Sequence, residues 1–290
     1  MLDLGYARPP LAQVRAIVQR ALDEDVGGGD VTTDNSVPEE QYSHGVLLAK
    51  QDAVLCGGHV FAETFRMVDA AVVVDLLLPD GAGISSGKVV ARIEGPTRAL
   101  LTAERTALNF VQRLSGIATA TAALVAELRG LPTRLIDTRK TTPGLRVLEK
   151  YAVRVGGGHN HRFNLADGVL LKDNHLAALR NRGLDLASAV RTIKQRIPHT
   201  MKVEVEVTSL DQIDAALAGG ADVILLDNMS NADMRDAVRL IGGRALTECS
   251  GKVTLETVRE RAETGVDLIS SGALTHSAKS VDLSLEIDLD

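Results

Sequence analysis

The sequence predicts an α/β protein in which an α+β domain precedes a barrel of parallel strands. Two observations carry this prediction. From residue 134 onward, short apolar runs alternate with amphipathic stretches at a steady interval, which is typical of repeated βα units. Before residue 102, strand-like and helix-like stretches are instead punctuated by glycine and proline, as in an α+β domain.

The first part of the chain predicts one helix over residues 11–23 and strands over residues 45–50, 72–77 and 88–93. Two further helices are expected over residues 102–114 and 117–129, with Thr102 as the cap of the first. Residues 281–289 alternate apolar with polar side chains, so we expect an edge strand that returns to the first domain. The predicted domains are therefore residues 1–102, joined by 277–290, and residues 103–276.

Six short apolar runs follow residue 134, and each has the composition of a strand that is buried on both faces. Right-handed crossovers turn such a series into a parallel sheet, which is either open or closed into a barrel. We favour the barrel because a polar or ionisable residue lies at the carboxyl end of every run, Glu206 in the third, and barrels collect their active sites at the carboxyl ends of the strands. The runs are residues 134–137, 168–172, 202–207, 222–227, 245–248 and 267–270.

Composition and charge exclude several classes of function. The 290 residues are 45% hydrophobic and 24% charged, which is typical of a globular protein. Aromatic residues make up only 2% and the net charge is −6, so we expect neither nucleic-acid nor membrane binding. The chain has no signal-peptide pattern at its start, no apolar run long enough to span a bilayer and only two distant cysteines. These features predict a cytoplasmic protein.

Positive charge is concentrated in one section of this acidic chain. Residues 105–175 hold 11 Lys or Arg and 5 Asp or Glu, a balance of +6, whereas the remainder holds 21 and 33, a balance of −12. A cleft lined by cations suits a small polyanionic ligand. We expect Arg113, Arg129, Arg146, Lys150 and Arg154 to lie on solvated helix faces. The candidates for anion binding are Arg105, Arg139, Lys140, Arg162 and Lys172.

The strand ends carry side chains suited to anions and to a metal ion. Arg139 and Lys140 are adjacent at a strand end, so their two cations can address different anionic groups. Glu206 and Asp227 end successive strands and suit a hydrated Mg²⁺ shared with phosphates, although one of them can instead neutralise Lys172 or Arg139.

Two further loops and one short motif complete the candidate site. Small residues at Ser250 and Gly251, and at Ser271 and Gly272, follow the last two strands and can offer backbone N–H groups to a phosphate. Residues 159–161 form a His-x-His pair, which binds metal only if a third ligand lies near it. The sequence does not identify that ligand.

Eight ordered motifs strongly resemble the quinolinate phosphoribosyltransferase family, also called nicotinate-nucleotide pyrophosphorylase. Glu24, Asp25 and residues 29–32 are similar to that family too, so the resemblance covers nearly the whole chain. The motifs are residues 104–109 (ERTALN), 137–145 (DTRKTTPGL), 150–154 (KYAVR), 156–162 (GGGHNHR), 172–175 (KDNH), 203–207 (VEVEV), 225–228 (LLDN) and 272–276 (GALTH).

The resemblance implies an N-terminal sandwich domain and an incomplete α/β barrel of the type II phosphoribosyltransferase kind, assembled as a homodimer or a higher homo-oligomer. It implies that quinolinate and phosphoribosyl pyrophosphate give nicotinate mononucleotide, pyrophosphate and CO₂, with Mg²⁺. By the same resemblance, quinolinate is held by Arg105, which enters from a neighbouring subunit, and by Arg139, His161, Arg162 and Lys172. Lys140, Glu206, Asp227 and the loops at Ser250, Gly251, Ser271 and Gly272 hold the donor and its metal.

The sequence departs from the family pattern at Cys249, at Lys252 and at the Ser270-Ser271 pair before Gly272, so the details of the phosphate loops stay open. A relative of the molybdenum-transport accessory proteins, which share the barrel and the Thr-Arg-Lys motif, is the alternative. The presence of Arg105, His161, Arg162 and Lys172 together favours quinolinate over that alternative. A Schiff-base aldolase that uses Lys140 or Lys172, and an anion-binding protein without turnover, are more distant alternatives.

Overall fold

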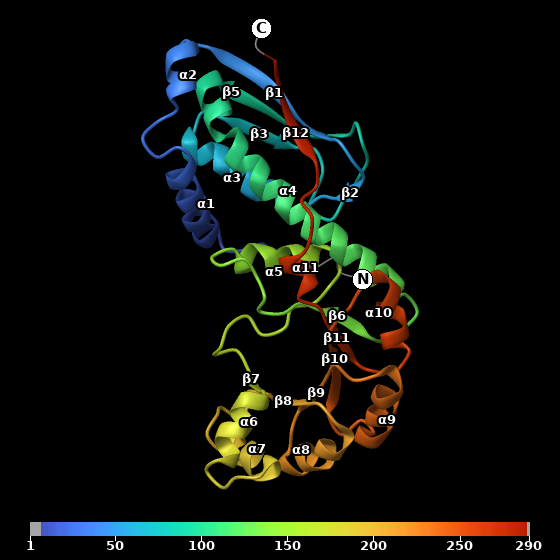
Figure 1. The fold of residues 1–290 in the computed structure, drawn as a ribbon. Coiled ribbons are helices and arrows are strands. Elements are labelled where there is room, and N and C mark those ends of the chain that lie inside the picture. The colour runs from blue at the N-terminus through green and yellow to red at the C-terminus, as the bar shows by residue number, and fades with distance from the viewer. Residues whose placement is uncertain (1–6, 289–290) are drawn as a thin grey trace. The chain divides into compact units, whose positions relative to one another are not determined.

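A computed structural model describes residues 7–288 and has the predicted mixed α/β architecture (Figure 1). The chain divides into two compact units. The first comprises Met1–Ala122, Thr141–Gly157 and Leu274–Asp290, and the second comprises Ala123–Lys140 and Gly158–Ala273. Each unit therefore combines segments that are distant in the sequence. The expected second domain, in contrast, was one continuous segment, residues 103–276.

The first unit is built on an antiparallel sheet with the strand order β12-β1-β5-β3. β12 pairs with β1, and Leu285 lies opposite Leu47, which confirms the predicted return of the C-terminal segment as an edge strand (Figure 1). The elements are α1 (Leu11–Asp25), α2 (Val31–Ser36), β1 (Tyr42–Ala49), β2 (Ala53–Val54), α3 (Gly58–Val68), β3 (Val73–Leu76), β4 (Gly83–Ile84), β5 (Val89–Pro96), α4 (Thr97–Glu127), α5 (Arg146–Val155), α11 (Ala273–His276) and β12 (Leu283–Asp288).

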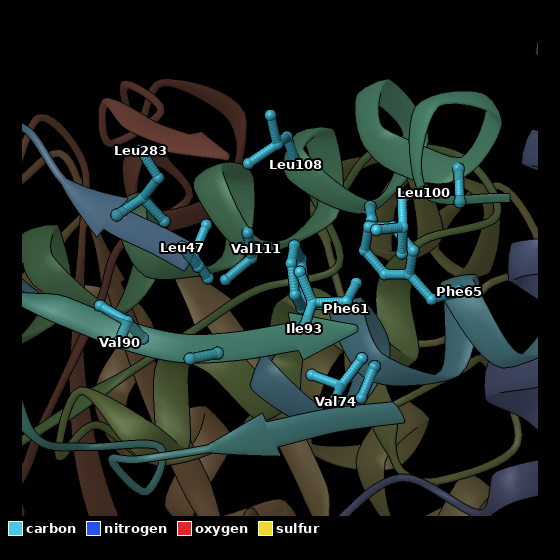
Figure 2. Packing of buried hydrophobic residues seen from close by; sticks show 14 of the residues in the cluster. Leu47, Phe61, Phe65, Val74, Val90, Ile93, Leu100, Leu108, Val111 and Leu283 are labelled. Carbon is cyan, nitrogen blue, oxygen red and sulfur yellow. The ribbon is translucent and has the colours of Figure 1, made fainter. Parts of the chain in front are cut away.

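The hydrophobic core of this unit lies between one face of the sheet and two helices. Strand residues alternate between buried and exposed positions because successive side chains point to opposite faces. Figure 2 shows the buried side chains of the strands beside those of α3 and α4. The labelled members of this core are Leu47, Phe61, Phe65, Val74, Val90, Ile93, Leu100, Leu108, Val111 and Leu283.

One continuous helix, α4, replaces the two helices that we expected on either side of residue 116, so that prediction was wrong. Gly116 does not break the helix. A Cβ atom at this position would lie 2.0 Å from the carbonyl oxygen of Lys279, so the glycine allows the C-terminal segment to pass close to the helix. Gly116 is therefore explained by the close packing of the C-terminal segment and not by a break in the helix.

Three of the cations that we placed on solvated helix faces, Arg113, Arg146 and Lys150, are in fact partly or fully buried. Arg113 forms an ion pair with the fully buried Glu149, with 3.0 Å between Nη2 and Oε1, and its Nη1 donates to the carbonyl oxygen of Ala278. Lys150 is only 2% exposed. The prediction was wrong because the periodicity of a helix shows which face is apolar but not which long polar side chain has a buried partner.

The second unit contains a six-stranded parallel sheet with the order β6-β11-β10-β9-β8-β7. The last strand, β11, pairs with the first, β6, whereas β6 and β7 are not neighbours in the sheet, so the barrel is incomplete on that side. All six predicted strands are present. The elements are β6 (Arg134–Ile136), β7 (Val169–Leu171), α6 (Asp173–Arg180), α7 (Leu186–Lys194), β8 (Val203–Val207), η1 (Leu210–Gln212), α8 (Ile213–Gly219), β9 (Val223–Asp227), α9 (Asn231–Ile241), β10 (Leu246–Ser250), α10 (Leu255–Ala262) and β11 (Leu268–Ser270).

The chain leaves the second unit between β6 and β7. Residues 141–157, with α5, belong to the first unit, and residue 158 returns to the second. Within residues 7–288, no helix combines the length and the apolar character that crossing a bilayer requires.

Candidate active site

The register of the parallel sheet places the candidate carboxylates on one face. Glu206 and Glu248 each pair with Leu225 on the strand between them, and Ser250 pairs with Asp227. Paired residues of neighbouring parallel strands point to the same side, as do residues two apart on one strand. Glu206, Asp227, Glu248 and Ser250 therefore share one face near the carboxyl ends of β8, β9 and β10, where barrels carry their active sites.

Lys172 and Glu206 meet directly in this site. The Nζ of Lys172 donates to Oε2 of Glu206 at 2.6 Å, and the lysine side chain is 47% exposed. The neutralisation that we considered for one of the two strand-end carboxylates is therefore present at Glu206. Asp227 instead accepts a hydrogen bond from the side-chain amide of Asn228 at 2.8 Å.

A largely buried cluster of His161, Glu204 and Glu248 lies on the same face of the sheet. The Nε2 of His161 lies 2.9 Å from Oε2 of Glu204 and 3.6 Å from Oε2 of Glu248. Their ligand atoms lie within 4.8 Å of one another, which is close enough for a metal ion, and this is the only such group of three among the described residues. Burial, followed by the charge of Glu204, raises the pKa of Glu248 well above 4.5.

The backbone around His161 is fixed by β6. His159 forms a parallel bridge with Ile136, so residues 159–161 run beside that strand. Asp137 is fully buried and accepts hydrogen bonds from the side-chain amide of Asn160 at 2.7 Å and from the backbone N–H of His161 at 2.8 Å. The strand-end Asp137 thus holds the histidine motif in place.

Two arginines bring like charges together in the second unit. Burial and the charge of the Arg139 guanidinium lower the pKa of Arg162 below its ordinary value, while Glu204 acts in the opposite direction. Nη1 of Arg162 also donates to the carbonyl oxygen of Gly168 at 2.9 Å. The like charges of the two guanidinium groups repel each other, and a bound dianion would relieve that repulsion.

The two predicted phosphate loops differ in what they can offer. Gly251 has φ = +116°, and a Cβ there would lie 2.6 Å from the side-chain oxygen of Asn228, so only glycine fits beside that amide. Ser271 is 4% exposed and its N–H donates to the carbonyl oxygen of Ile136, so this N–H is used by the sheet. Ser250 and Gly272 are half-buried at the ends of β10 and β11.

Two candidate residues, Arg105 and Lys140, have exposed side chains. Arg105 is exposed on α4, in the first unit, whereas every other candidate belongs to the second unit. Lys140 is exposed, and its backbone N–H is held by the hydroxyl of Thr138 at 3.0 Å.

Sequence reasoning missed Glu204 and did not assign Glu248 to the site. The signal for Glu204 was present, because the Val-Glu-Val-Glu-Val alternation places Glu204 and Glu206 on the same face of β8. Glu248 was recognised only as a polar residue at a strand end. Together they supply the groups near His161 that the His-x-His motif lacked in the sequence.

Family models match almost the whole chain. The model described as quinolinate phosphoribosyl transferase, N-terminal domain, matches residues 30–115, and the C-terminal domain model matches residues 117–286. A Bacillus subtilis (strain 168) protein named probable nicotinate-nucleotide pyrophosphorylase (carboxylating) is 42% identical over 277 residues, which cover 96% of this chain and 94% of that protein.

Solved structures agree with these sequence matches. NadC from Streptococcus pyogenes is 43% identical, with a TM-score of 0.92 over 97% of this chain and 99% of that chain. The nicotinate-nucleotide pyrophosphorylase from Francisella tularensis is 38% identical, with a TM-score of 0.91 over 97% and 98%. The molybdenum-transport alternative is not favoured by these matches. With its two unit folds, its strand-end residues and these relatives, the chain belongs to the quinolinate phosphoribosyltransferase family.

Proposed function

We propose that this protein transfers the phosphoribosyl group of phosphoribosyl pyrophosphate to the ring nitrogen of quinolinate. The products are nicotinate mononucleotide, pyrophosphate and CO₂, so the enzyme is a decarboxylating pentosyltransferase of NAD biosynthesis. The observation that carries this proposal is the family match over almost the whole chain, and the excess of cations in residues 105–175 of this acidic protein supports it.

Quinolinate binds through its two carboxylates to Arg139, Arg162 and Lys172. The planar guanidinium groups bind a carboxylate through two parallel hydrogen bonds and so orient the pyridine ring. Lys172 exchanges Glu206 for a substrate carboxylate when quinolinate enters. His161 lines the same pocket, and Arg105 completes it from a neighbouring subunit.

Phosphoribosyl pyrophosphate binds at the carboxyl ends of the neighbouring strands. Lys140 and the loops at Ser250, Gly251 and Gly272 contact its phosphates. Ser271 lies in the last of these loops, but its N–H does not bind phosphate because it donates to the carbonyl oxygen of Ile136. The carboxylates of Glu206 and Asp227 suit Mg²⁺, because they are hard oxygen ligands on one face of adjacent strands. Mg²⁺ bound there would neutralise charge on the leaving pyrophosphate.

The arrangement of charges explains why the reaction needs a protein. Quinolinate and the donor are both polyanions, and the cations of the pocket remove the repulsion between them. The ring nitrogen forms a bond with the anomeric carbon while the bond from that carbon to pyrophosphate breaks. Positive charge develops on the sugar, and the carboxylates of Glu206 and Asp227 oppose it, while Lys140 stabilises the leaving group.

Decarboxylation follows from the product of that transfer. The alkylated nitrogen is cationic and withdraws electrons from the adjacent ring carbon. The bond between this carbon and its carboxylate breaks, CO₂ leaves, and the electron pair stays on the ring carbon, which then takes a proton. The protein contributes by holding the ring in place and by limiting the access of water.

A direct assay tests the function. Purified protein with ring-labelled and carboxyl-labelled quinolinate should release CO₂ only when phosphoribosyl pyrophosphate is added, and nicotinate mononucleotide should appear in equal amount. Release of CO₂ without the donor, or no release with it, would contradict the proposed reaction.

The assignment of Arg105 to a neighbouring subunit makes the homodimer testable. Arg105→Ala and Arg162→Ala variants should each be inactive, and a refolded equal mixture should regain about a quarter of the wild-type activity, because half of the dimers then hold one intact site. A mixture that stays inactive would place both residues in the same chain's site.

We also place the enzyme in the cytoplasm. Cys56 and Cys249 are both buried free thiols, which fits a reducing compartment. Fractionation of the source cells with an antibody against the protein tests this location.

A further inference from the structure

Glu204 and Glu248 are buried acidic residues that the proposed reaction does not use. They are 6% and 2% exposed, and they lie on the face of the parallel sheet that carries the site. Buried carboxyl groups are costly unless they are paired. The neighbouring positions on that face, Val223 and Leu225, are apolar, so the fold does not require acids at this level of the sheet.

Both acids converge on one ring nitrogen of His161. Nε2 lies 2.9 Å from Oε2 of Glu204 and 3.6 Å from Oε2 of Glu248. The other ring nitrogen, Nδ1, accepts the backbone N–H of Arg162 at 2.6 Å. Because Nδ1 is an acceptor, the ring proton lies on Nε2 and is donated to Glu204.

This chain of contacts leads to the arginine that binds substrate. Glu204 holds Nε2, the imidazole ring holds the Arg162 backbone through Nδ1, and Asp137 holds the His161 backbone N–H. A rotation of the imidazole ring would break its hydrogen bond to the backbone N–H of Arg162. The backbone that carries the guanidinium group would then no longer be held in place. Side chains that set the orientation of a binding group in this way influence substrate binding without contacting the substrate.

The second acid stabilises the first. Burial and the charge of Glu204 raise the pKa of Glu248 well above 4.5, and Glu248 also interacts with the hydroxyl of Ser270. A protonated Glu248 can donate a hydrogen bond to Glu204. Oε1 of Glu204 is buried without a hydrogen-bond partner, which is a cost that an apolar residue would avoid.

We propose that Glu204 and Glu248 are positioning residues, which act through His161 to hold Arg162 in the orientation that binds quinolinate. This inference rests on the proposed function, in which Arg162 binds a quinolinate carboxylate. Neither acid touches the substrate in this assignment, so their loss affects the binding of quinolinate and leaves the binding of phosphoribosyl pyrophosphate largely unchanged.

Steady-state kinetics with three variants test the proposal. Glu204→Ala should raise the KM for quinolinate about tenfold or more and change the KM for phosphoribosyl pyrophosphate by less than about twofold. Glu204→Gln keeps an oxygen that accepts a hydrogen bond from Nε2 of His161, so its KM for quinolinate should be close to the wild-type value. Glu248→Gln keeps a donor toward Glu204 and should resemble the wild type. A merely structural role would lower the amount of folded enzyme without shifting one KM selectively.

A double variant tests whether Glu204 affects quinolinate binding through His161 or directly. In a His161→Ala background, Glu204→Ala should cause no further rise in the quinolinate KM, because the connection to Arg162 is already lost. Glu263→Gln is the matched control, since it removes an exposed carboxylate of the same unit that pairs with Arg259 at the surface. Circular dichroism of each variant checks that it folds.

Three results would overturn the proposal. An unchanged quinolinate KM in the folded Glu204→Gln and Glu204→Ala variants would do so, as would an equal rise with and without His161. Metal analysis that found one tightly held Zn²⁺ or Mn²⁺ per wild-type chain, absent from Glu248→Gln, would make these residues metal ligands instead. Failure of the proposed function is distinct, because the wild-type enzyme would then release no CO₂ from quinolinate.

Discussion

Lys172 and Glu206 form a direct ion pair in the second unit, with 2.6 Å between Nζ and Oε2. We assign the lysine to quinolinate and the carboxylate to the donor and its metal. In the proposed assignment, these two opposite charges satisfy each other until the substrates bind, and both then exchange partners. The proposal thus makes this ion pair a connection between the two binding sites.

This exchange predicts opposite effects on binding and turnover. Glu206→Gln removes the charge that competes for Lys172, so quinolinate should bind about twofold to tenfold more tightly, which isothermal titration calorimetry measures. The same variant, and more completely Glu206→Gln with Asp227→Asn, should lose Mg²⁺-dependent turnover. Wild-type turnover in the double variant, or weaker quinolinate binding in the single one, would contradict the assignment.

The arginine pair predicts a large loss of quinolinate binding on truncation. Charge-assisted hydrogen bonds contribute about 1.5–3 kcal/mol each, so Arg162→Ala or Arg139→Ala should weaken binding by about tenfold to 150-fold. Calorimetry measures this change, and the melting temperature should stay close to the wild-type value. Arg239→Ala, at an exposed ion pair of α9, is the control and should bind normally. Equal affinities for all three variants would refute the site.

The buried acid Glu248 predicts a pH dependence of stability. Its pKa is raised in the folded protein, so the unfolded chain ionises first, and wild-type stability falls as pH rises above about 4.5 until it reaches the folded pKa. Glu248→Gln has no such ionisation. The melting temperature of the variant relative to the wild type should therefore increase as pH rises above about 4.5. A difference that is constant with pH would show that Glu248 is ionised in the folded protein.

Gly116 predicts a packing defect that a matched glycine does not share. Gly116→Ala directs a methyl group against the carbonyl oxygen of Lys279 and should destabilise the protein by about 1–3 kcal/mol, as overpacking does. Gly83 has nothing within 4 Å of a built Cβ, so Gly83→Ala should change stability far less. Chemical denaturation of both variants provides the comparison. Equal stabilities would mean that the C-terminal segment adjusts without cost.

The sequence by itself determined the six strands of the second unit, the edge strand at the C-terminus and the family to which the chain belongs. Each of these is encoded locally, because buried parallel strands are short apolar runs and strand-end residues follow directly from them. The family motifs are also contiguous stretches of the chain, so the reaction class follows from them without any knowledge of tertiary contacts.

Only the tertiary structure decided which charged groups meet. The continuity of α4 through Gly116, the burial of Arg113 against Glu149 and the ion pair of Lys172 with Glu206 all depend on segments that are far apart in the sequence. The same holds for Glu204 and Glu248, which the register of three parallel strands brings together beside His161. Periodicity assigns a side chain to a face, but its partner on that face is set by strand order and register, which no local pattern contains.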